Sequence, residues 1–94
     1  MLFAVECRDK PGHLEVRMSN RPAHLAYLEA NLDRIRFAGP LLAEDGTTPI
    51  GSLLVVEAAD RAAIEAFCAA DPYTLAGLFA EVRQTPWRQV LPKA

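Results

Sequence analysis

Two segments that favour β-strands are apolar on both of their faces, and this feature constrains the fold most. In LFAVEC (residues 2–7), alternate side chains point to opposite sides of an extended strand, and both sets are apolar as far as Val5. SLLVVEA (residues 52–58) has the same property. An antiparallel sheet with one face in water would instead alternate apolar and polar residues. The sequence therefore predicts a sheet that is covered on both sides.

The expected elements follow the order β-α-β-β-α-β. Asn20 and Asp60 are suitable N-caps for two helices, and Pro22 and Pro72 are tolerated in the first turn of a helix. We expect strands at 1–8, 35–44, 52–58 and 81–91, a turn at 45–51, helices at 21–33 and 61–70, and a short helix from residue 72. This order predicts a single α+β domain over residues 1–94, a ferredoxin-like βαββαβ fold with a four-stranded antiparallel sheet and two helices on one face.

Prolines mark the less regular parts of this fold. Gly39 and Pro40 interrupt the second strand and indicate an edge or a bulge, because proline donates no ladder hydrogen bond. Pro86 predicts a similar irregularity in the last strand. Residues 11–19 remain open between a loop and a helical turn.

The second face of the sheet needs a cover of its own, because two helices can cover only one face. A monomer rarely leaves so large an apolar patch exposed, so we favour a second copy of the chain, packed sheet against sheet as a symmetric homodimer. The alternative is that C-terminal residues such as Trp87 and Leu91 fold over part of that surface.

Composition and charge exclude several classes of function. Hydrophobic residues make up 51% of the chain, charged residues 23%, and the net charge is −2, which is typical of a globular protein. No basic stripe is present to bind a phosphate backbone, so nucleic acid is not an expected partner. No apolar stretch approaches the roughly 20 residues needed to span a bilayer, so no membrane partner is expected. The N-terminus resembles a strand and not a signal peptide, which predicts a cytoplasmic protein.

The cysteines and histidines do not indicate a metal or a catalytic thiol. Cys7 and Cys68 are expected to be reduced packing residues. His13 and His24 are eleven residues apart, and no Cys/His ligand spacing occurs. We therefore expect no metal site, and no organic cofactor is indicated.

RPAHLAYLEANLDR (residues 21–34) is an amphipathic helix with polar residues on its apolar side. His24 lies four residues before Leu28, the centre of the apolar stripe, and Arg21 lies three residues before His24. The stripe also includes Leu25, Leu32 and Ile35. The two polar residues must either be satisfied by ordinary partners or line a pocket.

Asp71, in the segment ADPY, is expected to lie at the end of the second helix, beside the first. An aspartate that contacts His24 would fix the imidazole tautomer and raise its basicity, as a general base requires. The ordinary alternatives are that Asp71 caps the following short helix and that His24 bonds to backbone. An arginine could hold an anionic group bidentately, and a tyrosine could supply a phenolic donor or an aromatic wall. The candidate ligand-binding residues are Arg17, Arg21, Gly39, Pro40, Ser52 and Tyr73.

The motifs together resemble a known family. The segment LFAVECRDKPGHLEVRMSNRPAHLAYL is similar to the start of YciI-like proteins, the YCII-related or DGPF superfamily. AGPLLAEDG…GSLLVVEAAD is similar to the second and third strands of that family, and ADPYTLAGLF to its DPY segment. The likeness runs along essentially the whole chain. No DGPF segment occurs, so the branch associated with transcription-related fusions gains no support.

This resemblance implies a ferredoxin-like subunit that dimerises through its sheets into a dimeric α/β barrel. It also implies a cleft in which His24 and Asp71 face one another as a catalytic pair. Relatives in the wider dimeric-barrel group include muconolactone-isomerase-like enzymes and a dehydrochlorinase that acts on a chlorinated hydroxyquinol.

The leading hypothesis is therefore a small-molecule enzyme that performs acid–base chemistry without a cofactor. Isomerisation, lactone hydrolysis or dehydrohalogenation of a small carboxylate-like substrate would suit a His/Asp pair. The alternatives are a non-catalytic ligand-binding or accessory domain, and a structural dimer whose cleft is vestigial.

Overall fold

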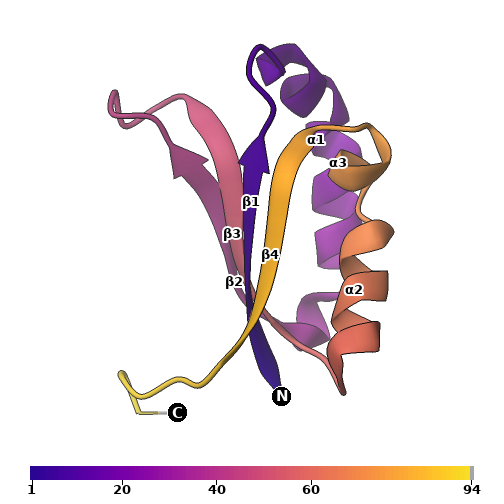
Figure 1. The fold of residues 1–94 in the computed structure, drawn as a ribbon, viewed down its shortest axis with the longest axis vertical. Helices are drawn as coiled ribbons and strands as arrows, with labels where there is room; N and C mark the ends of the chain where they lie inside the picture. The colour runs from indigo at the N-terminus through magenta and orange to yellow at the C-terminus, as the bar shows by residue number, and fades with distance from the viewer. Residues whose placement is uncertain (94) are drawn as a thin grey trace.

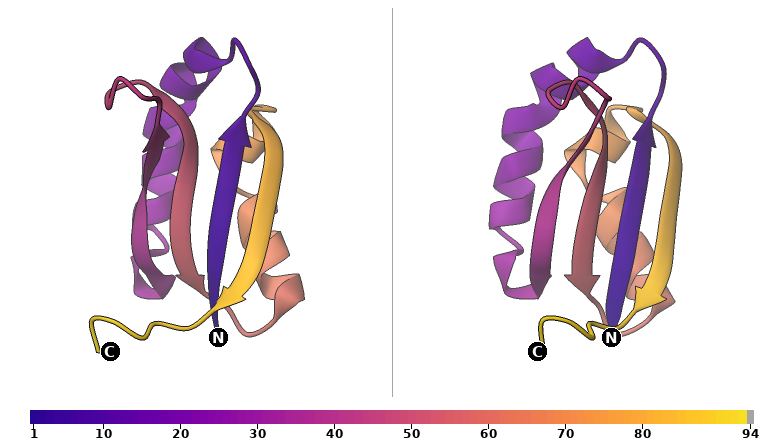
Figure 2. Two further views of the ribbon diagram at one scale, coloured as in Figure 1. Left: turned by 60° about the vertical axis from the view of Figure 1, so that its left-hand side comes forward. Right: turned by 90° about the vertical axis from the view of Figure 1, so that its left-hand side faces the viewer.

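The computed structural model describes residues 1–93 and confirms the ferredoxin-like βαββαβ fold (Figure 1). The strands are β1 (Leu2–Asp9), β2 (Ile35–Leu42), β3 (Pro49–Glu57) and β4 (Phe79–Trp87), and the helices are α1 (Leu14–Glu29), α2 (Arg61–Ala69) and α3 (Pro72–Leu75), with a 3₁₀ turn at Leu32–Arg34. The strands form one antiparallel sheet in the order β2-β3-β1-β4. All helices cover the same face of that sheet (Figures 1 and 2).

The core lies between the helices and the two central strands. Phe3 pairs with Val56 and Val5 with Leu54, and all four side chains are buried on the helical side. Ile64 and other apolar residues of α2 pack against them. The alternation of period two along β1 and β3 thus determines which side chains enter the core.

Helix α1 begins at Leu14, seven residues before the predicted start. Asn20 is not a cap, because it lies inside the helix and its side-chain amide donates to the Val16 carbonyl at 2.8 Å. Pro22 lies in the interior and not in the first turn. It removes the hydrogen bond to the Met18 carbonyl, but both residues are exposed, so water can replace that bond. Residues 11–19 were left open between a loop and a helical turn, and the structure shows that the helical alternative is correct from Leu14 onward.

Pro40 and Pro86 lie in the two edge strands, and Pro49 is the first residue of the central strand β3. Pro40 is in β2, whose ladder shifts register on either side of it, as the prediction of an edge or bulge requires. Pro86 pairs with Phe3 in a regular part of the β4 ladder, so the predicted irregularity there is wrong. The register shift in the pairing of β4 with β1 lies between Arg8 and Asp9. An edge strand tolerates proline without a bulge because its outer N–H groups need no partner strand.

The boundaries of two strands also differ from the prediction. β3 begins at Pro49, inside the predicted turn at 45–51, because its first residues pair with the end of β2. β4 ends at Trp87, where its pairing with Leu2 ends, so the predicted extension to residue 91 is wrong.

The face of the sheet opposite the helices is only partly apolar. Phe37 and Leu53 on this outer face are 58% and 43% exposed. Glu6 and Arg8 carry charge on the same face of β1, so the prediction of apolar character holds at the start of β1 but not at its end. Leu91 is 79% exposed, so it buries little apolar area against the chain. Within residues 1–93, no helix has the length and apolar character needed to cross a membrane.

Candidate active site

The buried side of α1 presents two polar side chains. Arg17, His24 and Leu28 are its buried residues, and their spacing of seven and four places them on one face of the helix. Arg21 is exposed on the same side. Leu32 is not part of the buried stripe as predicted: it lies in the 3₁₀ turn after α1 and is 63% exposed. The helix therefore packs on the sheet through a partly polar face.

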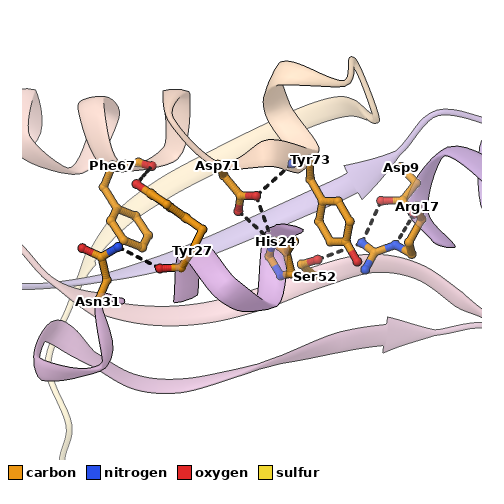
Figure 3. A network of polar contacts seen from close by, with 9 residues as sticks. All are labelled: Asp9, Arg17, His24, Tyr27, Asn31, Ser52, Phe67, Asp71 and Tyr73. Atoms are coloured by element: carbon orange, nitrogen blue, oxygen red, sulfur yellow. Dashed lines mark hydrogen bonds and ion pairs between the residues drawn. The ribbon is translucent and has the colours of Figure 1, made fainter. Parts of the chain in front are cut away.

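His24 and Asp71 contact each other across 47 residues of sequence (Figure 3). The imidazole Nδ1 lies 2.8 Å from Oδ1 and 3.1 Å from Oδ2 of the buried carboxylate. Oδ1 also accepts the Tyr73 backbone N–H at 2.9 Å and so caps α3. Asp71 thus combines the two roles that the sequence left as alternatives, because one carboxylate oxygen can accept both hydrogen bonds.

The other ring nitrogen of His24 remains available. No hydrogen bond to Nε2 is formed within residues 1–93. In these residues, every side-chain nitrogen or oxygen that is fully buried has a hydrogen-bond partner. Nε2 is therefore accessible, and His24 lines the principal cavity of this part of the chain. Asp71 does not line that cavity and lies behind the imidazole.

Arg17 is the centre of a second buried polar cluster. Its Nε donates to Asp9 Oδ2 at 2.7 Å, and its Nη2 donates to Asp9 Oδ1 at 3.0 Å and to Ser52 Oγ at 2.8 Å. The side chains of Arg17 and Asp9 are only 5% and 8% exposed. Burial opposes the charged form of Arg17, but the hydrogen bonds and charge of Asp9 outweigh it and raise the pKa of Arg17.

Sequence reasoning missed Asp9 as a site residue. It ends β1 and falls in the same alternation as Phe3, Val5 and Cys7, which all face the helices. Its inward position at the end of a strand could have revealed it, because a buried carboxylate needs a charged or hydrogen-bonding partner.

Tyr73 packs between the two polar groups (Figure 3). The His24 and Tyr73 rings are stacked with centroids 3.9 Å apart and planes inclined by 13°. The Arg17 guanidinium carbon lies 4.6 Å from the centre of the Tyr73 ring. Phe79 meets the same ring edge-on at 6.0 Å. The aromatic ring thereby fixes the relative positions of the imidazole and the guanidinium.

A cavity of about 460 Å³ lies beside these residues, between α1 and strands β2 and β3. All six predicted ligand-binding residues line it: Arg17, Arg21, Gly39, Pro40, Ser52 and Tyr73. Met18, Thr47 and Pro49 also line it and were not predicted. Thr47 and Pro49 come from the β2–β3 connection, whose position depends on the tertiary fold.

Burial holds the two thiols in their neutral form. Burial, with smaller contributions from neighbouring charges, raises the pKa of Cys7 from its ordinary value of 9.0 to about 12. Burial also raises the pKa of Cys68. Both side chains are therefore protonated at neutral pH. Among residues 1–93, no three His, Cys, Asp or Glu side chains gather as a metal-binding group.

Comparison with known proteins places the chain in a family. Residues 1–88 match the model of the YCII-related domain. The chain belongs to the YCII-related family. It is 38% identical over 97 aligned positions to the protein YciI of Escherichia coli, with 96% of this chain and 99% of that protein covered.

Solved structures with the same fold include a characterised enzyme. The structure of 5-chloro-2-hydroxyhydroquinone dehydrochlorinase from Burkholderia phenoliruptrix, in complex with 2,5-dihydroxybenzoquinone, is 39% identical, with a TM-score of 0.89 and 96% of each chain covered. A protein from Bacteroides thetaiotaomicron named as a putative antibiotic biosynthesis monooxygenase has a TM-score of 0.59 at 12% identity, over 100% of this chain and 92% of its own, and shows the fold alone. The YCII-related chain thus resembles dimeric α/β barrel structures.

Proposed function

We propose that this YCII-related protein is a small-molecule enzyme in which His24 transfers protons to and from a substrate bound in the cavity. One observation carries the proposal: a buried imidazole is held at Nδ1 by Asp71 at 2.8 Å, and its Nε2 is accessible on the wall of the cavity. Its similarity to a dehydrochlorinase, at 39% identity over 96% of both chains, supports an enzymatic role.

Asp71 sets the chemistry of His24. A carboxylate that accepts from Nδ1–H leaves Nε2 without a proton, so its lone pair faces the substrate as a general base. When Nε2 takes a proton, the carboxylate stabilises the resulting imidazolium. The stacked Tyr73 ring and the hydrogen bond together prevent rotation of the imidazole, and this orients the lone pair.

The cavity wall favours an electron-rich or anionic substrate. Its charged groups are Arg17 and Arg21, and within residues 1–93 no Asp or Glu side chain lines it. Asp9 and Asp71 lie behind the groups that they hold. Such a wall stabilises negative charge that develops on a substrate after a proton is removed.

Dehydrohalogenation of a halogenated, hydroxylated ring fits this apparatus. His24 takes the proton of a ring hydroxyl, and the O–H electron pair forms a carbonyl. The shifted ring electrons accept that proton back from His24 at the carbon that bears the halogen. Removal of a second hydroxyl proton by His24 then forms a second carbonyl and expels the halide with the electron pair of its carbon–halogen bond, so a quinone forms and the last proton passes from His24 to solvent. Isomerisation and lactone hydrolysis of a small carboxylate-like compound use the same first proton transfer.

The outer face of the sheet supports a homodimer. Phe37 and Leu53 form part of an exposed apolar surface on a face that no helix covers. We propose that a second copy packs against it around a two-fold axis, which buries both patches at once. Light scattering coupled to gel filtration measures this directly. A mass of two chains is expected, and a single-chain mass at high concentration would contradict the dimer.

Two histidine variants test the enzymatic role. Halogenated hydroxyquinols, lactones and small carboxylates are screened by absorbance for turnover and by thermal shift for binding. His24→Ala is expected to abolish turnover in a protein that still folds, with a lower melting temperature because the buried Asp71 carboxylate loses its imidazole partner. The control is His13→Ala, because His13 lies just before α1 and does not line the cavity. Turnover that survives His24→Ala, or falls equally in both variants, refutes the proposal.

A further inference from the structure

Tyr73 has a hydroxyl group whose proton finds no acceptor within residues 1–93. The residue is only 1% exposed, and its Oη interacts with the Arg17 guanidinium, which can donate a hydrogen bond but cannot accept one. A buried tyrosine hydroxyl normally finds a partner, because desolvation without a hydrogen bond is costly. Tyr73 lines the cavity, so a ligand bound there can supply the missing acceptor.

Arg17 brings a second set of free donors to the same place. Its Nε and Nη2 are engaged by Asp9 and Ser52, and the guanidinium also interacts with the Tyr73 hydroxyl. Nη1 carries two N–H donors, so at least one of them is left for a ligand. Arg17 also lines the cavity. The Tyr73 ring extends from the His24 side toward Arg17, with its oxygen at the Arg17 end (Figure 3).

Both groups are held as donors. The two hydrogen bonds to Asp9 fix the guanidinium plane, so the direction of the Nη1 N–H groups is fixed as well. Burial raises the pKa of Tyr73, with the charges of Arg17 and Arg21 opposing the increase. The phenol is therefore protonated at neutral pH and can donate its proton in a hydrogen bond.

The geometry points to an oxyanion subsite formed by Tyr73 Oη and Arg17 Nη1, which binds an ionised oxygen of the substrate while His24 acts on another part of it. The Tyr73 ring stacks on His24 with centroids 3.9 Å apart, and Arg17, His24 and Tyr73 all line one cavity. A single oxygenated ring bound there can therefore contact both the subsite and Nε2. The inference rests on the proposed function, and it names the substrate class as a small ring with an enolate, phenolate or carboxylate oxygen.

The two tyrosines of the chain provide a matched test. Tyr73→Phe removes only the hydroxyl and keeps the stack with His24. Tyr27→Phe is the control, because the Tyr27 hydroxyl donates to the Phe67 carbonyl at 2.7 Å and Tyr27 does not line the cavity. Binding is measured by calorimetry with 2,5-dihydroxybenzoquinone and benzoate as acidic probes and with hydroquinone as a neutral one.

We expect Tyr73→Phe to weaken binding of an ionised probe about tenfold, or ~1.4 kcal/mol, and to leave binding of hydroquinone unchanged. If Tyr73→Phe weakens the binding of benzoate, the subsite accepts carboxylates. If it weakens the binding of 2,5-dihydroxybenzoquinone alone, the subsite accepts enolates and phenolates. Equal loss for the neutral probe, or no loss for either acidic probe, overturns the subsite. His24→Gln separates the two proposals, since it should abolish turnover but preserve the Tyr73-dependent binding.

Discussion

Replacing Asp71 with asparagine tests how the imidazole is controlled. Asp71 Oδ1 lies 2.8 Å from His24 Nδ1 and 2.9 Å from the Tyr73 backbone nitrogen. Asparagine is as good an N-cap as aspartate, so its oxygen can still accept from Tyr73 and α3 stays capped. The lost interaction is the charge-assisted bond to His24, which is worth about 1.5–3 kcal/mol. The folded protein should therefore survive, with a lower melting temperature.

The effect on turnover should exceed the effect on stability. The asparagine amide presents an N–H to His24 Nδ1, so the ring proton moves to Nε2 and the base that faces the cavity is lost. Turnover should fall about 10²–10⁴-fold, the usual contribution of general acid–base catalysis. KM should change little, because Asp71 does not line the cavity. Steady-state kinetics and thermal melts on the same samples measure both effects.

Asp60→Asn is the matched control for this substitution. Asp60 caps α2 by accepting the Ala63 N–H at 2.9 Å, and it contacts no imidazole. This variant should keep wild-type turnover. Equal turnover in Asp71→Asn and wild type, or equal losses in the two variants, would refute the role assigned to Asp71.

Three further predictions concern the fold and the interface. Leu53→Asp should convert the proposed dimer to a monomer in light scattering. Leu75→Asp is the control and should leave the dimer intact, because Leu75 is exposed on α3. A dimer that persists in both variants excludes the outer face as the interface. Because the Cys7 thiol has a pKa of about 12 in the folded chain against an ordinary 9.0, its neutral form stabilises the fold below pH 9, and that contribution is lost as the pH rises toward 12. In urea titrations across this range, Cys7→Ala should reduce the alkaline loss of stability by up to about 1.4 kcal/mol per pH unit, and an unchanged slope would contradict the assignment. Pro22→Ala should raise the free energy of unfolding by about 1–3 kcal/mol, because alanine restores a helical hydrogen bond, and a lower melting temperature would show that the ring packs favourably.

The sequence predicted the sheet well because strand alternation is a local property. The inward positions of β1 and β3 follow from period two, and the pairing of these two strands follows from the ferredoxin-like order. The start of α1 could not be found in the same way. Pro22 reads locally as a first-turn residue, and only the tertiary structure shows that this turn lies on the solvent side, where the missing bond is tolerated.

The site was predictable where motifs carried it and not where the fold assembled it. His24 and Asp71 were singled out from RPAHL and ADPY, and the structure brings them to 2.8 Å. Asp9 was missed because its importance depends on Arg17, which lay in a segment read as a loop or a single turn. The contribution of Thr47 to the cavity lining was missed because the direction of a hairpin connection is not fixed until its two strands are paired.

A long-range ¹H–¹⁵N NMR spectrum of His24 tests the central claim most directly. The account predicts that the neutral ring carries its proton on Nδ1, toward Asp71, and that the Nε2 resonance shifts when 2,5-dihydroxybenzoquinone is added. A neutral ring with its proton on Nε2, or an Nε2 resonance that does not respond to a bound ligand, would contradict it.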